Sequence, residues 1–126
     1  MTQTILLVDD EPSLLKLMAL SLARHARKIG QEWQIRKADD AASAMAAVKD
    51  LSCGLNVLVT DIQMPEVTGE ELIRQVRQAC PLIDVLAISG ALPEGSPGLA
   101  NVQVLRKPFA MALLAESVQD LLAVQL

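Results

Sequence analysis

The sequence predicts an α/β protein built on a single five-stranded parallel sheet, doubly wound as (βα)5. Short apolar runs alternate with segments whose apolar residues recur at helical spacing along the 126 residues. The composition agrees, because 52% of the residues are hydrophobic while only 2% are aromatic. A core of aliphatic side chains is expected where helices cover both faces of a parallel sheet. We expect one domain over residues 1–126.

Five apolar runs have the length of buried strands and are too short for buried helices. The second run includes Gln34 and Arg36, so we expect that strand nearer an edge of the sheet. The fourth ends at Ser89 and Gly90. In chain order the predicted strands cover residues 5–8, 33–36, 57–60, 83–88 and 102–105.

Four helices are predicted from apolar residues three or four positions apart. Pro12 suits the first turn of the first helix, Asp39 or Asp40 can cap the second, and Pro81 ends the third. Residues 92–98 hold two prolines and two glycines, which predict a fourth helix that is short or broken. The helical repeats are Leu15, Met18 and Leu22; Ala41, Ala44, Val48 and Leu51; Leu72, Val76 and Ala79; and Met111, Leu114, Val118 and Leu121.

The charge balance argues against direct contact with nucleic acid, whose phosphates favour a basic surface. The net charge is −4. One cluster of five basic residues exists, but three of them fall at the end of the first predicted helix, where cations stabilise the helix dipole. No apolar run approaches the length of a membrane span or a leader sequence, so we expect a cytosolic domain. The cluster comprises Arg24, Arg27, Lys28, Arg36 and Lys37.

The two cysteines, Cys53 and Cys80, lie at no spacing typical of a metal or redox motif. We therefore expect them to be small, buried or half-buried thiols in a reducing compartment.

Polar residues fall where the predicted strands end. Asp9 and Asp10 follow the first strand, Asp61 the third, Ser89 the fourth and Lys107 the fifth. The carboxyl ends of parallel strands form one edge of a doubly wound sheet, and ligands bind there. Five segments that are distant in sequence therefore converge on one small cleft.

The charges in that cleft predict a divalent cation. Two carboxylates about 5 Å apart repel by roughly 3 kcal/mol at an effective dielectric constant near 20. One lysine and one doubly charged ion would neutralise three aspartates, and Mg²⁺ suits a site of carboxylates plus phosphate. A carboxylate that faces a metal-bound phosphate can attack it and form an acyl phosphate.

Four motifs, each in the expected order and place, resemble those of response regulator receiver domains over about residues 3–124. They are Val-Asp-Asp-Glu-Pro at 8–12, Asp-Ile-Gln-Met-Pro-Glu-Val-Thr-Gly at 61–69, Ser-Gly at 89–90 and Lys-Pro-Phe at 107–109. The resemblance implies the flavodoxin-like strand order 2-1-3-4-5 and a cis bond between Lys107 and Pro108. It also implies a histidine kinase or histidine phosphotransfer protein as phosphoryl donor, and an output domain or protein partner.

The same resemblance implies roles for the site residues. Asp61 is expected to accept the phosphoryl group, Lys107 to contact it and Ser89 to act as the switch hydroxyl. The metal, Mg²⁺, is expected to bind Asp10, Asp61 and the backbone carbonyl of Gln63, with Asp9 assisting through water. Such a domain catalyses its own phosphorylation and dephosphorylation and is not a turnover enzyme.

Two departures from the family pattern concern the output surface. The family often has an aromatic residue three positions before the lysine, and Val104 stands there. The predicted break in the fourth helix falls in the part of the family fold that reports phosphorylation. The sequence leaves open the cognate kinase, the output, the oligomeric state and whether the domain is part of a larger chain such as a hybrid kinase.

Two other functions are weighed against the receiver hypothesis. A small phosphatase of the haloacid-dehalogenase kind would use Asp9 as nucleophile and Glu11 as acid and base, but it would leave the motif at Asp61 unexplained. A receiver fold that is never phosphorylated is favoured by Val104 and the broken helix, and opposed by the intact acidic residues and lysine.

Overall fold

The computed structural model describes residues 2–90 and 102–123. Its five strands form one parallel sheet in the order β2-β1-β3-β4-β5, which confirms the predicted fold class. The strands are β1 (Gln3–Val8), β2 (Trp33–Ala38), β3 (Val57–Asp61), β4 (Asp84–Ser89) and β5 (Gln103–Arg106). The helices are α1 (Pro12–Lys28), α2 (Ala41–Asp50), α3 (Gly69–Ala79) and α4 (Met111–Ala123). The predicted short or broken helix at 92–98 lies outside the described residues.

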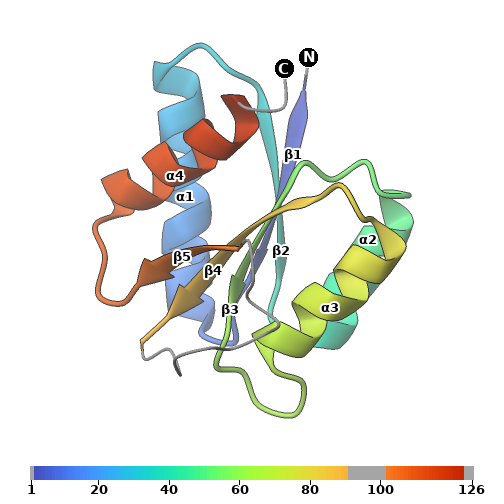
Figure 1. Ribbon diagram of the computed structural model, residues 1–126. Helices are drawn as coiled ribbons and strands as arrows, with labels where there is room; N and C mark the ends of the chain where they lie inside the picture. The colour runs from blue at the N-terminus through green and yellow to red at the C-terminus, as the bar shows by residue number, and fades with distance from the viewer. Residues whose placement is uncertain (1, 91–101, 124–126) are drawn as a thin grey trace.

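Helices α1 and α4 cover one face of the sheet, and α2 and α3 cover the other (Figure 1). Alternate residues of β1 point to opposite faces, as strand geometry requires. Ile5 and Leu7 join the core under α1 and α4, whereas Leu6 and Val8 join the core under α2 and α3. All four are fully buried, which explains why this strand has no polar alternation.

Local signals in the sequence set the ends of the helices. Pro12 begins α1, and Gly30 follows it with φ of 72°, a conformation that glycine adopts without strain. Of the two candidate caps for α2, Asp40 is the one used, since its Oδ1 accepts from the Ser43 backbone N–H at 2.7 Å. Thr68 caps α3 in the same way, accepting from the Glu71 N–H at 3.2 Å. Among the described helices, none is both long and apolar enough to cross a membrane.

The expectation of two free thiols is wrong, because Cys53 and Cys80 form a disulfide. Their Cα atoms lie 5.6 Å apart, within the range that a disulfide requires. The cause is tertiary: the segment after α2 and the end of α3 meet at the amino edge of the sheet. Because the cysteines are 27 residues apart, spacing alone gave no sign of the pairing.

Candidate functional site

The predicted site residues lie at the carboxyl edge of the sheet, toward which the arrowheads of the strands point in Figure 1. Strand β1 ends at Val8, β3 at Asp61 and β5 at Arg106, so Asp9 and Lys107 each follow a strand directly. Hydrogen bonds between strands fix this edge, since Ile62 N donates to Ile88 O at 2.9 Å and Lys107 N donates to Ser89 O at 2.9 Å. The sheet thus sets the relative positions of the acidic, basic and hydroxyl groups.

Asp61 and Lys107 form the central ion pair of the site. Lys107 Nζ donates to Asp61 Oδ2 at 3.2 Å and lies 4.0 Å from Asp9 Oδ2. The side chain of Asp61 is only 5% exposed, against 31% for Lys107. Partial burial lowers the pKa of Lys107, but the hydrogen bond to Asp61 and the negative charges of Asp61, Asp9 and Glu11 outweigh it and leave the pKa above its ordinary value. The lysine therefore stays charged beside the carboxylates.

Asp9 is the most buried carboxylate of the site, at 0% exposure. Its Oδ1 accepts from the Glu11 backbone N–H at 2.8 Å, while Oδ2 has no hydrogen-bond partner among the described residues. Burial and the nearby charge of Asp61 raise the pKa of Asp9, despite the opposing effect of the Glu11 bond and of Lys107. An ionised oxygen in this position gains from a nearby cation.

The donor set fits a divalent metal. Asp9, Asp10 and Asp61 each offer a carboxylate oxygen, and these oxygens lie within 4.8 Å of one another. Asp10 is exposed while the other two are buried, so the cluster is reached from solvent on one side. Hard cations take oxygen ligands of this kind. Asp9 Oδ2 accepts no hydrogen bond from the described residues and has only the Lys107 ammonium at 4.0 Å, so a second positive charge would stabilise it.

Ser89 and Gln63 are the other two predicted site residues near Asp61. Ser89 ends β4 and is fully buried, next to Ile88, which pairs with Asp61 in the sheet. Gln63 is exposed, and its backbone N–H donates to Asp61 Oδ1 at 3.1 Å. The two oxygens of Asp61 are thus engaged differently, Oδ1 by a backbone amide and Oδ2 by the Lys107 ammonium.

Three further features lie in the segments that carry the site residues. The peptide bond between Lys107 and Pro108 is cis, as the sequence resemblance implies. Gly69, the last residue of the motif at 61–69, begins α3 directly against the backbone of Asp61. Val104 is half-buried in β5 and packs against the core under α2 and α3.

A family model described as response regulator receiver domain matches residues 5–119 of the chain. The chain belongs to this family. The response regulator receiver protein CpdR of Brucella abortus is 30% identical over 122 residues, which cover 94% of this chain and 95% of CpdR. The sensor kinase CckA of the same species is 29% identical over 126 residues, covering 97% of this chain but 13% of the kinase.

Solved receiver structures have the same fold as this receiver domain. A receiver domain protein of Methanospirillum hungatei matches with a TM-score of 0.82 at 23% identity, over 99% of this chain and 97% of that one. The response regulator TrrA of Thermotoga maritima, in complex with Mg²⁺ and BeF, matches with a TM-score of 0.79 at 22% identity, over 94% and 98%. Among curated relatives this domain spans 13% of CckA and 44% of the regulator TrcR of Mycobacterium tuberculosis.

Proposed function

We propose that Asp61 accepts a phosphoryl group from a phosphohistidine, on a histidine kinase or a histidine phosphotransfer protein, and that phosphorylation changes the affinity of the domain for a partner. The observation that carries the proposal is the position of the Asp61 carboxylate, 3.2 Å from Lys107 Nζ and within 4.8 Å of two further carboxylates. Phosphorelay relatives such as CckA and CpdR support it.

In the proposed transfer, a carboxylate oxygen of Asp61 forms a bond to phosphorus while the bond from phosphorus to the donor histidine nitrogen breaks. Lys107 offsets the negative charge on the phosphoryl oxygens, and the Ser89 hydroxyl donates a hydrogen bond to one of them. The Gln63 N–H holds Asp61 Oδ1 and so limits rotation of the carboxylate. These groups are fixed by the sheet before the donor arrives, which lowers the cost of orientation.

We propose Mg²⁺ as the cofactor. Asp10, Asp61 and the carbonyl oxygen of Gln63 would bind it directly, and Asp9 would bind through water. When bound, Mg²⁺ supplies positive charge that offsets the three carboxylates and the incoming phosphoryl group.

The wider proposal is a single receiver domain over residues 1–126 that phosphorylates and dephosphorylates itself without turning over a separate substrate. We propose a cytoplasmic location, because a donor that is phosphorylated from ATP is found there. Direct binding to nucleic acid or membrane is not part of the proposal. No residue of the domain identifies the output partner. The domain spans 44% of each of two regulators that it resembles, TrcR and TcrX.

A phosphatase that uses Asp9 as nucleophile is disfavoured by geometry. Asp9 is fully buried, and one of its oxygens is held by the Glu11 N–H at 2.8 Å. The positive charge that would stabilise a transferred phosphoryl group is also nearer the other carboxylate, since Lys107 Nζ lies 3.2 Å from Asp61 and 4.0 Å from Asp9.

The decisive experiment is labelling with radioactive acetyl phosphate in the presence of Mg²⁺, followed by hydroxylamine, which cleaves acyl phosphates. Label should appear on the wild type, disappear on treatment with hydroxylamine and be absent from Asp61→Asn. The matched control is Asp39→Asn, which changes an exposed carboxylate just after β2 and should label normally. Undiminished labelling of Asp61→Asn would refute the assignment. A wild type that neither takes label nor responds to Mg²⁺ with beryllofluoride would favour a domain that is never phosphorylated.

A further inference from the structure

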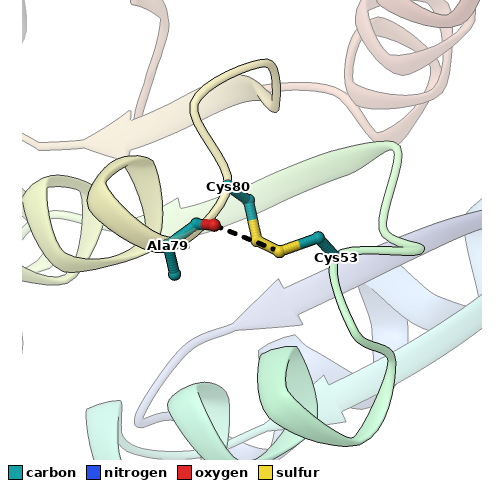
Figure 2. Close-up of a disulfide and its surroundings, with 3 residues drawn as sticks. All are labelled: Cys53, Ala79 and Cys80. Atoms are coloured by element: carbon teal, nitrogen blue, oxygen red, sulfur yellow. Dashed lines mark hydrogen bonds between the residues drawn. A yellow bond between two sulfur atoms is a disulfide. The ribbon is translucent and has the colours of Figure 1, made fainter.

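The disulfide lies at the end of the molecule opposite the phosphorylation site. Cys53 is in the segment before β3 and Cys80 in the segment before β4, so both sit at the amino edge of the sheet. Figure 2 shows the cross-link between the end of α3 and the loop that leads into β3. The aspartates and Lys107 are at the carboxyl edge, so the cysteines and the site residues lie at opposite ends of the strands.

The cross-link closes a covalent ring around the segment that carries the phosphoryl acceptor. The two cysteines are 27 residues apart, and the ring contains β3, the loop after it and α3. Asp61 and Gln63 therefore lie inside the ring. Closing a ring of this size restricts the unfolded chain and stabilises the folded one.

The two segments are also held by bonds that do not involve sulfur. After α2, Ser52 N donates to Lys49 O at 3.0 Å and Gly54 N donates to Leu51 O at 2.7 Å. At the end of α3, Cys80 N donates to Val76 O at 2.7 Å. The backbone around both cysteines therefore has hydrogen bonds that do not require the cross-link.

Both sulfurs have suitable surroundings as thiols. Cys53 Sγ lies 3.3 Å from the carbonyl oxygen of Ala79, drawn as a dashed line in Figure 2, and a thiol there can donate to that oxygen. Cys80 is 6% exposed and belongs to the apolar core under α2 and α3, where a thiol packs as a small hydrophobic group. The folded domain thus accommodates both the oxidised and the reduced pair.

We propose that Cys53 and Cys80 form a reversible redox modification site, opened by a dithiol reductant, that sets the stability of the β3–α3 unit without altering the phosphorylation site. The reductant thiolate attacks Cys53 Sγ, the Cys53–Cys80 bond breaks, and Cys80 leaves and takes up a proton. The second thiol of the reductant then attacks the mixed disulfide, releases Cys53 as a thiol and leaves the reductant as a disulfide. Two electrons and two protons pass to the cysteine pair.

The direction of attack follows from exposure. Cys53 is exposed, whereas Cys80 is 6% exposed, so an incoming thiolate reaches Cys53 first. Attack in line with the sulfur–sulfur bond then makes Cys80 the leaving group. The mixed disulfide therefore forms on Cys53.

The first test counts free thiols by maleimide labelling and mass spectrometry, before and after treatment with dithiothreitol, and measures the melting temperature in each state. The oxidised domain should take up no maleimide and the reduced domain two. Reduction should lower the melting temperature by on the order of 10 °C. The Cys53→Ser/Cys80→Ala double variant should melt near the reduced wild type and ignore dithiothreitol. Two free thiols that glutathione disulfide or air fails to oxidise, or a melting temperature that reduction leaves unchanged, would overturn the proposal.

The second test separates this site from the phosphorylation site. Affinity for Mg²⁺ with beryllofluoride should be the same within about twofold in the oxidised domain, the reduced domain and the double variant. A domain that fails to bind beryllofluoride in every state still tests the redox site through its melting temperature and thiol count. In the single variants, Cys53 of Cys80→Ala should react with Ellman's reagent at least ~10-fold faster than Cys80 of Cys53→Ser. A faster Cys80 would contradict the direction of attack.

Discussion

A β-carbon on Gly69 would lie 2.0 Å from the carbonyl oxygen of Asp61 and 2.7 Å from the Cα of Ile62. The first residue of α3 therefore presses directly on the backbone of Asp61, the proposed phosphoryl acceptor. The Gly69 N–H also donates to Ile62 O at 2.9 Å, which fixes the approach. Only glycine leaves room for this close contact between the start of α3 and the end of β3.

Gly69→Ala should destabilise the domain by about 3 kcal/mol or more, since the backbone of Asp61 and Ile62 has to move to admit one methyl group. Urea unfolding measures the change. Gly90→Ala is the control, because its new carbon would meet only Gln63 Oε1 at 3.6 Å, an ordinary contact. Its effect should stay below about 1 kcal/mol. Equal losses in the two variants would show that the close approach to Asp61 has no energetic consequence.

Asp9→Asn should make the Mg²⁺-free domain more stable, by roughly 1–3 kcal/mol at neutral pH, because it removes one of three neighbouring negative charges. The sign follows from the raised pKa of Asp9 in the folded state. The protonated form is favoured by folding, so the stabilisation is present below the ordinary pKa of aspartate and is lost as pH rises through the raised value. Thermal unfolding in EDTA at several pH values measures it. If the Asp9→Asn variant is less stable than the wild type at neutral pH in EDTA, the prediction is contradicted.

With Mg²⁺ present the same substitution should act in the opposite direction. Asp9→Asn should weaken Mg²⁺ binding by about 10-fold or more, as expected for a carboxylate that assists a metal through water. The wild type should gain more thermal stability from Mg²⁺ than the variant does. Asp39→Asn, an exposed change at the same edge of the sheet, is the control and should bind Mg²⁺ like the wild type.

The sheet and the grouping of charges could be predicted because they depend on order along the chain. A strand that is buried on both faces, such as β1, is apolar throughout, and its end is marked by Asp9. Parallel pairing then brings Asp61 and Lys107 to the same edge with no further information. Strand β2 extends beyond the predicted apolar run to Ala38, since an edge strand can continue through polar residues.

Other features depend on contacts between distant segments, and no local sequence pattern predicts those contacts. The disulfide needs the end of α3 beside the segment after α2, which follows only from how the two helices pack on the sheet. The steric role of Gly69 needs the three-dimensional path of the loop, and the motif indicates only that a glycine is there. The positive φ of Glu66 could not be predicted either, because glutamate is not a residue that favours this conformation.

Glu71 should titrate far below a normal glutamate. Its carboxylate is paired with Arg74, through Nε at 2.8 Å and through Nη2, and Gln75 donates to it at 3.3 Å. The hydrogen bonds from Arg74 and Gln75 lower the pKa of Glu71 from 4.5 to about 2. An NMR titration of the side-chain carboxyl carbon should report this value. In Arg74→Gln the pKa should move back toward 4.5.

The sign of the effect on stability follows from the lowered pKa. The contribution of the Glu71–Arg74 pair is complete above about pH 4.5 and is lost as pH falls toward 2. The difference in melting temperature between the wild type and Arg74→Gln should therefore be constant at neutral pH and shrink over that window. Lys16→Gln, which removes an exposed cation from α1, is the control. Its difference in melting temperature from the wild type should not shrink over that pH window. A difference that grows on acidification would contradict the prediction.

Glu66→Gly should stabilise the domain. Glu66 has φ of 66° in the loop between β3 and α3, where its β-carbon crowds the backbone and glycine does not. Relief of that strain exceeds the extra freedom of glycine in the unfolded chain, so we expect a gain of up to about 1 kcal/mol by urea unfolding. The same substitution at Glu116, exposed within α4, should cost about 1 kcal/mol, because glycine disfavours a helix interior. The two Glu→Gly changes should thus have opposite signs, and a loss of stability at both positions would show that the loop after β3 holds Glu66 without strain.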